Sequence, residues 1–386
     1  MAESDSHVPE KQETSSKKKE VSIDDLYRRS SQFQLWSFTI EELDNLRKTT
    51  HEDGRVAALA RFEEAKKKFS LEKKEVYEQF ADEFTSDKLL DLITFDEQQK
   101  YLQYFAQQII QTCVHFGMPT QVRATAVSFF QRFYLLNSPM SYQPKNIVFT
   151  CVFLAAKSEN YFISIDSFCS LLPSTEKSDI LNLEFDVLQS LKFTLLVHHP
   201  FRPLYGFFLD IQQVLLHPTP VMYDVNIDTI GGLYDEAKRW LNDHALIGDV
   251  SFLFTPPQIA LAALFDCNKR VTNKYLKLKF IKEKSNEKME TIKEELSDEV
   301  KEENGEEKAE TNGGSLEASN TSQKSDSTKI YEELIATIRK CISVAKSEIE
   351  TSREECISID KKCVYVLKPE KLIKKKVKSL TKDPVS

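Results

Sequence analysis

Glycine is scarce in this sequence. Nine of the 386 residues are glycine, and five of these lie between residues 95 and 281. β-Hairpins and phosphate-binding loops both depend on glycine, because its backbone adopts positive φ without steric cost. The scarcity therefore favours an all-α fold and argues against a nucleotide-binding enzyme.

The sequence also lacks the motifs of metal sites and catalytic centres. Its seven cysteines include no CxxC pair, and its seven histidines show no HExxH spacing. No GxxxxGK[ST] loop, GxGxxG fingerprint, kinase HRD or DFG set, or GxSxG elbow occurs. We therefore expect no catalytic residue, no metal and no cofactor. The scattered cysteines are typical of reduced core residues in an intracellular protein.

Long apolar runs and a signal peptide are missing as well. No apolar run approaches the roughly 18–20 residues that a membrane-spanning helix requires. The first twenty residues are polar throughout. We expect a soluble protein of the cytoplasm or nucleus.

Charge is distributed unevenly around a net value of −8. Residues 282–328 hold 14 acidic and 7 basic side chains, whereas residues 361–386 hold nine lysines and two acidic residues. The rest of the chain is mildly acidic, so the core shows no nucleic-acid footprint. The lysine-rich end is either a solvated tail, an import signal or a contact with a polyanion.

Apolar periodicity divides the middle of the chain into two blocks. Residues 94–198 contain five helical segments, and the third, PKNIVFTCVFLAAKSEN, is apolar almost all round. A second block begins at residue 199, where TPPQIALAALFDC occupies the same ordinal place. This block is one helix short before residue 281, and we assign the missing helix to residues 329–349. The sequence predicts two tandem five-helix repeats.

The remaining segments flank or interrupt these repeats. Residues 1–30 are expected to be disordered, and residues 31–93 are expected to form an N-terminal helical extension. The acidic stretch 282–328 has no apolar stripe and is predicted to be a disordered insertion. Residues 350–386 are expected to form a final helix and a basic tail.

Two opposite charges lie beside apolar faces in the first repeat. Lys157 follows the apolar run that contains Phe153, and Glu184 projects from the apolar stripe of the fifth segment. Three interpretations are open: each charge is solvated at a helix margin, the two form a salt bridge, or both contact a partner helix. Desolvated charges of the third kind act as binding hot spots when their hydrogen bonds are satisfied.

At these residues the sequence resembles a cyclin. QVRATAVSFFQRFYLLNS and FTCVFLAAKSEN are similar to helices two and three of a cyclin box, and ILNLEFDVLQSLKF is similar to helix five. WSFTIEELDNLR, HHPFRPLYGFFLDIQ and LFTPPQIALAAL resemble the cyclin H branch, in a fungal form. The resemblance implies two cyclin-box repeats with additional N- and C-terminal helices. It also implies a kinase interface that contains Lys157 and Glu184, with Phe153 and Glu159 beside them.

The resemblance further implies a regulatory role and not an enzyme. Cyclin H-like proteins are regulatory subunits of the CDK-activating kinase, which is also the kinase module of general transcription factor IIH. The expected partners are a cyclin-dependent kinase, a RING-containing assembly factor and the TFIIH core, without nucleic acid or membrane. The expected location is the nucleus, and the expected output is phosphorylation of the RNA polymerase II C-terminal domain.

A different two-repeat helical module, of the general transcription factor IIB type, is the alternative. It would bind DNA and polymerase, and it predicts basic repeat surfaces and a zinc ribbon. The mildly acidic core and the absence of a zinc-ribbon motif argue against it.

Overall fold

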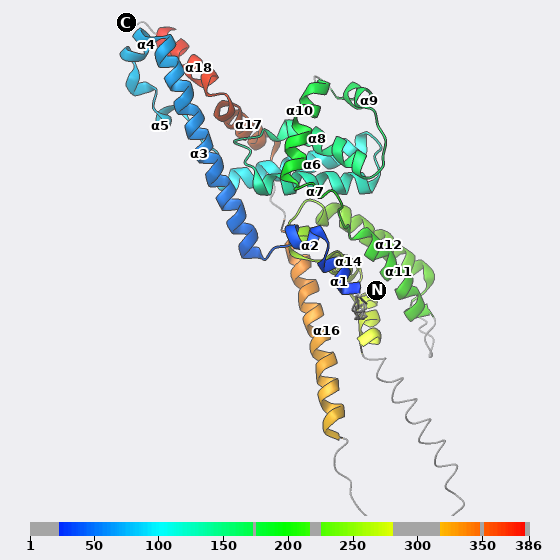
Figure 1. The fold of residues 1–386 in the computed structure, drawn as a ribbon. Coiled ribbons are helices and arrows are strands. Elements are labelled where there is room, and N and C mark those ends of the chain that lie inside the picture. Colours follow the sequence, from blue (N-terminus) through cyan, green and yellow to red (C-terminus); the bar gives the residue numbers. More distant parts are fainter. Residues whose placement is uncertain (1–22, 173–174, 217–224, 281–316, 348–350, 383–386) are drawn as a thin grey trace, which may run out of the picture.

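The computed structural model describes residues 23–172, 175–216, 225–280, 317–347 and 351–382. Every regular element in these ranges is a helix, so the all-α prediction is confirmed. No helix in them is both long enough and apolar enough to cross a membrane. Figure 1 shows two compact helical bundles and a long helix, α3, that extends away from them.

The first repeat consists of α6 (Phe95–His115), α7 (Thr120–Leu136), α8 (Pro144–Ser158), α9 (Ile165–Ser170) and α10 (Lys177–Ser190). Pro144 occupies the first turn of α8, where a missing amide proton costs nothing. Residues of all five helices form one core, in which nearly the whole of α8 is buried. The central third helix predicted from its apolar composition is therefore present.

The second repeat is built around α14 (Pro256–Cys267), which a capping box at Thr255 begins. Around it pack α11 (Phe201–Leu216), α12 (Ile227–Trp240), residues 269–280 and α16 (Glu317–Ala345). A π-helical turn, η2 (Leu241–Ala245), and the short α13 (Val250–Leu253) connect α12 to α14. Helix α16 contributes Ile335, Ile338 and Cys341 to the shared core, as expected of the missing fifth helix.

Helix α16 begins earlier than the sequence predicts. Residues 317–328 fall within the insertion expected to be disordered, yet they are helical. The physical reason is propagation: once Ile335 and Ile338 anchor the helix, each further residue adds one backbone hydrogen bond to an existing turn. Residues 282–316 of the predicted insertion lie outside the described residues.

Residues 23–28 form helix α1, which corrects the disorder expected for this part of the N-terminal segment; residues 1–22 lie outside the described residues. Helices α1 (Ile23–Arg28) and α2 (Ser31–Trp36) lie against the junction of the two repeats. Tyr27 packs edge-on against His198, and Trp36 is 1% exposed. These apolar anchors are too few to give a local periodic signal, so only the tertiary contacts explain why the segment folds.

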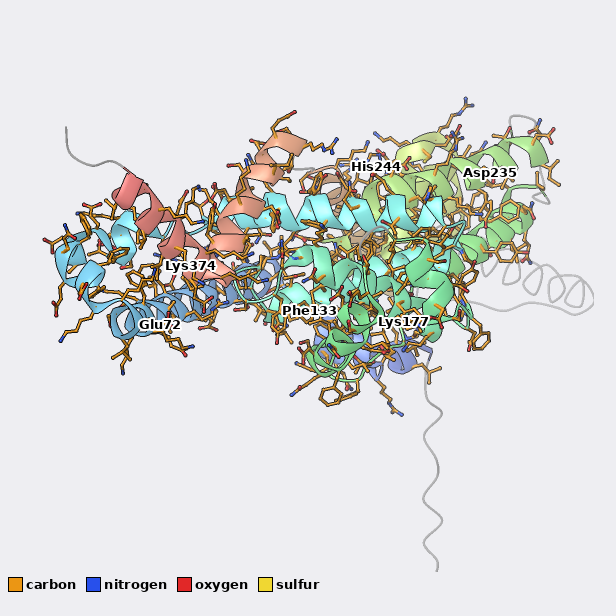
Figure 2. All side chains as sticks on the ribbon, turned by 90° about the horizontal axis from the view of Figure 1, so that it is seen from above. Glu72, Phe133, Lys177, Asp235, His244 and Lys374 are labelled. Atoms are coloured by element: carbon orange, nitrogen blue, oxygen red, sulfur yellow. The ribbon has the colours of Figure 1, made fainter. Side chains whose placement is uncertain are left out.

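The rest of the N-terminal extension forms a lobe with the end of the chain. It comprises α3 (Ile40–Glu72), α4 (Lys74–Gln79), η1 (Ala81–Glu83) and α5 (Ser86–Leu89), with α17 (Arg353–Leu367) and α18 (Pro369–Lys382). Its own core contains Phe62, Phe69, Phe84 and Ile373. Figure 2 shows Glu72 and Lys374 together at one end of the molecule, with Asp235 of the second repeat at the other.

The predicted basic tail is therefore wrong, because its residues form α18. Ile373, Val377 and Leu380 follow one another at helical spacing and pack against α3. The many lysines between them make the mean hydropathy low, which hides this stripe in the sequence. Lys371, Lys374, Lys375 and Lys378 are exposed, whereas Lys376 is half-buried and pairs with Glu83.

Candidate functional site

The end of α8 brings Lys157 to the surface. The ten residues before it include nine that are buried, whereas the Lys157 side chain is 44% exposed. The helix ends because Asn160 adopts φ of +57°, a left-handed conformation that asparagine tolerates better than most residues. Lys157 therefore stands at the last turn of a rigid, enclosed helix, where its charge also suits the helix dipole.

Lys157 and Glu184 are neighbours in the folded chain. The Lys157 ammonium donates to Glu184 Oε1 and lies 4.7 Å from the centre of the Phe153 ring. Phe153 is itself buried and packs against Phe168, so it supports the lysine from behind. Of the three interpretations left open by the sequence, the structure of the free chain shows the salt bridge. Because both side chains remain partly exposed, this pair is available to a partner.

Glu159 does not join this pair. It accepts a hydrogen bond of 2.7 Å from the Thr125 hydroxyl, whose oxygen lies 2.8 Å from His199 Nε2. Because the hydroxyl proton points to Glu159, the His199 ring is the donor to Thr125. Glu159 is therefore linked through Thr125 to His199 in the linker between the repeats.

Helix α10 presents an apolar surface around the charged pair. Leu181 is 46% exposed and Phe185 is 62% exposed, one turn apart on the face that carries Glu184. By helical spacing Leu181 belongs to the apolar stripe of the fifth segment, and that spacing predicts burial, which is wrong here. Helical spacing identifies a face but not whether a neighbouring helix covers it. The Phe193 ring, 62% exposed, lies 6.3 Å from that of Phe185. We call Leu181, Phe185 and Phe193 the α10 patch.

The backbone that positions Phe193 is strained. Lys192 and Phe193 follow α10 with φ of +53° and +56°, which costs roughly 1–2 kcal/mol for each residue with a side chain. Such strain persists where the surroundings over-determine it, and it is frequent at functional sites. Here it turns Phe193 outward and leaves its ring exposed.

Helix α2 supports this corner of the molecule, which the sequence analysis did not identify. The Trp36 ring lies between two cations, at 5.2 Å from the Arg132 guanidinium and 5.6 Å from the Lys192 ammonium. Its Nε1 donates to Thr194 Oγ1 at 3.0 Å. The Gln32 amide pairs with both backbone groups of His198, at 2.7 and 3.1 Å. No local pattern predicts these contacts, because they join residues more than 90 positions apart.

Among the described residues, no group of histidine, cysteine and acidic side chains has the arrangement of a metal site. The pKa of His199 is lowered to about 4, first because burial disfavours its charged form and then because Arg132, His198 and Arg202 are near. Arg132 and Arg202 thus place two positive charges near this ring.

The comparison with protein families agrees with this geometry. The model of the cyclin N-terminal domain matches residues 75–196, and that of the cyclin C-terminal domain matches residues 199–346. These ranges contain the two helical repeats described above. The chain belongs to the cyclin family.

Individual relatives place the chain closer to one branch, and the expected resemblance to cyclin H is confirmed. Cyclin CCL1 of Saccharomyces cerevisiae is 43% identical over 268 residues, which cover 68% of this chain and 63% of that protein. Cyclin-H of Xenopus laevis is 30% identical over 253 residues, which cover 64% of this chain and 69% of that protein. The matched part of the chain thus spans somewhat less than two thirds of the length of CCL1.

A solved structure shows the same arrangement. A chain in the electron cryomicroscopy structure of the yeast TFIIK (Kin28/Ccl1/Tfb3) complex is 32% identical, with a TM-score of 0.55. The match covers 83% of this chain and 100% of that chain. The alternative of a factor of the IIB type receives no support from these matches.

Proposed function

We propose that this chain is the regulatory subunit of a cyclin-dependent kinase and binds that kinase through Lys157, Glu184 and the α10 patch. The single observation that supports this most strongly is that a charged pair at the end of a rigid helix lies beside exposed aromatic side chains. The resemblance to CCL1, and to a chain of a complex that contains Kin28, supports a kinase as the partner.

The charged pair is prepared for a partner by its surroundings. As an exposed pair it adds only about 0.2–1 kcal/mol to the stability of the free chain. A bound helix would remove it from water, and each charge would then gain hydrogen bonds to exposed backbone groups at a helix end. Phe153 and the enclosed α8 hold the lysine in place, so little side-chain entropy is lost on binding.

Affinity measurements with the kinase most like Kin28 from the same source test the proposal. We expect Lys157→Ala and Glu184→Ala each to weaken binding by about 1–3 kcal/mol, or about 5- to 150-fold in Kd. Phe185→Ala is expected to weaken binding without removing a charge. Circular dichroism should show unchanged thermal unfolding, because the free chain depends little on these exposed side chains.

Lys346→Ala is the matched control. Lys346 forms an ion pair of 2.7 Å with Asp266 on the second repeat, and the exposures of the two side chains, 48% and 22%, resemble those of Lys157 and Glu184. The control should bind the kinase like wild type. Wild-type affinity of both first-repeat alanine variants would show that the proposed interface is wrong.

The larger assembly follows from the same resemblance. We propose that the chain acts in a CDK-activating kinase, the kinase module of transcription factor IIH, with a RING-containing assembly factor as third subunit. This module binds the TFIIH core. The chain itself contributes no catalytic residue, and the kinase phosphorylates the RNA polymerase II C-terminal domain in the nucleus. Glu159 remains a predicted secondary contact with the kinase. Because its carboxylate accepts a hydrogen bond from Thr125 within the free chain, this prediction has to be tested by mutating Glu159.

A further inference from the structure

A cavity of about 630 Å³ opens where the N-terminal helices meet the linker between the two repeats. Helices α1 and α2 form one wall, residues 196–203 form a second, and the start of α14 forms a third. It is separate from the Lys157–Glu184 pair, neither of which lines it. Its edge at Leu196 is 67% exposed, so the cavity is open to solvent there.

Two arginines line this cavity. Arg28 of α1 and Arg202 of α11 both line it, and both are exposed. Among the side chains that the structure describes, no carboxylate lies within 4.0 Å of either guanidinium. An arginine that lines a cavity and has no acidic neighbour can donate its guanidinium hydrogen bonds to a ligand.

The electrostatics of the wall point in the same direction. His198 and His199 also line the cavity, and the pKa of each is lowered by burial and by the nearby Arg202 and Arg132. The one carboxylate on the wall, that of Glu159, accepts the Thr125 hydroxyl proton. The cavity therefore favours an anionic group near its arginines.

Apart from Tyr27, Gln121 and Thr255, the remaining walls are apolar, which argues against a small inorganic ion as the natural occupant. Phe33, Phe201, Pro256 and Pro257 lie along the cavity. A water molecule takes about 30 Å³ of the liquid, so a lone anion would leave most of the volume unfilled. Aromatic and proline side chains instead suit an extended peptide, whose own side chains would cover them.

We propose that this cavity binds a phosphorylated segment of a partner protein, with the phosphoryl group between the guanidinium groups of Arg28 and Arg202. A phosphoryl group carries about −1.5 to −2 charge at pH 7 and offers three acceptor oxygens. Two arginine forks match that charge and geometry, whereas a glutamate side chain supplies a single charge. The apolar walls hold the residues that flank the modified one.

Retention of the purified full-length chain on immobilised peptide libraries tests this proposal. One library has a fixed phosphoserine with random flanking residues, a second has serine at that position, and a third has glutamate. We expect at least tenfold stronger retention on the phosphoserine library than on either of the others. The double variant Arg28→Gln, Arg202→Gln should lose this preference, while the double variant Arg339→Gln, Lys340→Gln, an equal loss of charge at exposed positions of α16, should keep it.

Each other outcome overturns the proposal. Equal retention on the serine library would show that the phosphoryl group is not recognised. Equal retention on the glutamate library would mean that any acidic peptide suffices. A preference that survives the double variant would locate the phosphate elsewhere on the chain. Because the libraries contain no kinase, the result is independent of whether the proposed kinase interface is correct.

Discussion

Replacing Gly54 by alanine is expected to destabilise this protein, although the same change stabilises most helices. Gly54 lies inside α3, where α3 crosses the turn that follows α7. A Cβ atom at Gly54 would lie 2.2 Å from Ser138 Oγ and 2.3 Å from Ser138 Cβ. Ser138 is 3% exposed, and its hydroxyl accepts from the Met140 amide and contacts Gln98. It therefore cannot move outward without breaking buried hydrogen bonds.

The change in the free energy of unfolding caused by Gly54→Ala follows from two opposing contributions. Alanine in a helix interior is favoured over glycine by about 1 kcal/mol. Against this, overpacking costs about 1–3 kcal/mol, and a buried polar group that loses its partner costs about 1–3 kcal/mol more. The net loss is about 1–5 kcal/mol, and its central value of about 3 kcal/mol should lower Tm by about 6–12 °C at about 2–4 °C per kcal/mol.

Gly206 supplies the matched control, because a Cβ there would have no neighbour within 4 Å. Gly206→Ala in α11 should raise Tm by about 2–4 °C, since only the helix propensity changes. Thermal unfolding followed by circular dichroism measures both variants. The double variant Gly54→Ala, Ser138→Gly should recover part of the loss, because it removes both clashing atoms. A Gly54→Ala protein as stable as wild type would refute the close approach of α3 to this turn.

Three further predictions concern buried groups. Trp36→Ala should cost about 3–5 kcal/mol, because a fully buried ring is lost, and limited proteolysis should then cleave near α2. Burial lowers the pKa of His199 to about 4, below the value of about 6.5 in the unfolded chain. The unfolded chain therefore binds this proton first, so the stability that neutral His199 contributes is fully present above about pH 6.5 and falls as the pH drops toward 4. His199→Gln should flatten that part of a urea-denaturation pH series, and an unchanged slope would contradict the assignment. Burial raises the pKa of Cys113 and Cys363 to about 12, so iodoacetamide at pH 8 should label them only in urea, as mass spectrometry would show.

Much of the fold could be predicted from the sequence because it is locally encoded. The five helices of the first repeat have strong apolar periodicity and clear stops, such as Gly117 at φ of +63° after α6. The start of helix α14 can be predicted from Thr255, a favourable N-cap residue, and from the two prolines that follow it. The joining of α16 to the second repeat could also be predicted, because a five-helix unit with one member missing leaves apolar surface uncovered.

The elements that could not be predicted depend on distant partners. Helix α18 has three well-spaced apolar residues among lysines, and its folding depends on α3, some 300 positions earlier. Helices α1 and α2 are held by Gln32 and Trp36, which contact the linker near His198. The exposure of Leu181 and the inward turn of Glu159 likewise follow from neighbours and not from spacing. Periodicity identifies which residues share a face, but only packing decides what lies against it.

The pairing of α3 with α18 has a consequence for how the protein is made. The ribosome produces α3 before both repeats, but its partners α17 and α18 only after them. Until they emerge, the apolar side chains of α3 at Phe62 and Phe69 lack part of their cover. The lobe therefore completes its folding only after both repeats have been synthesised. A chain cut short before α17 would leave this apolar surface exposed.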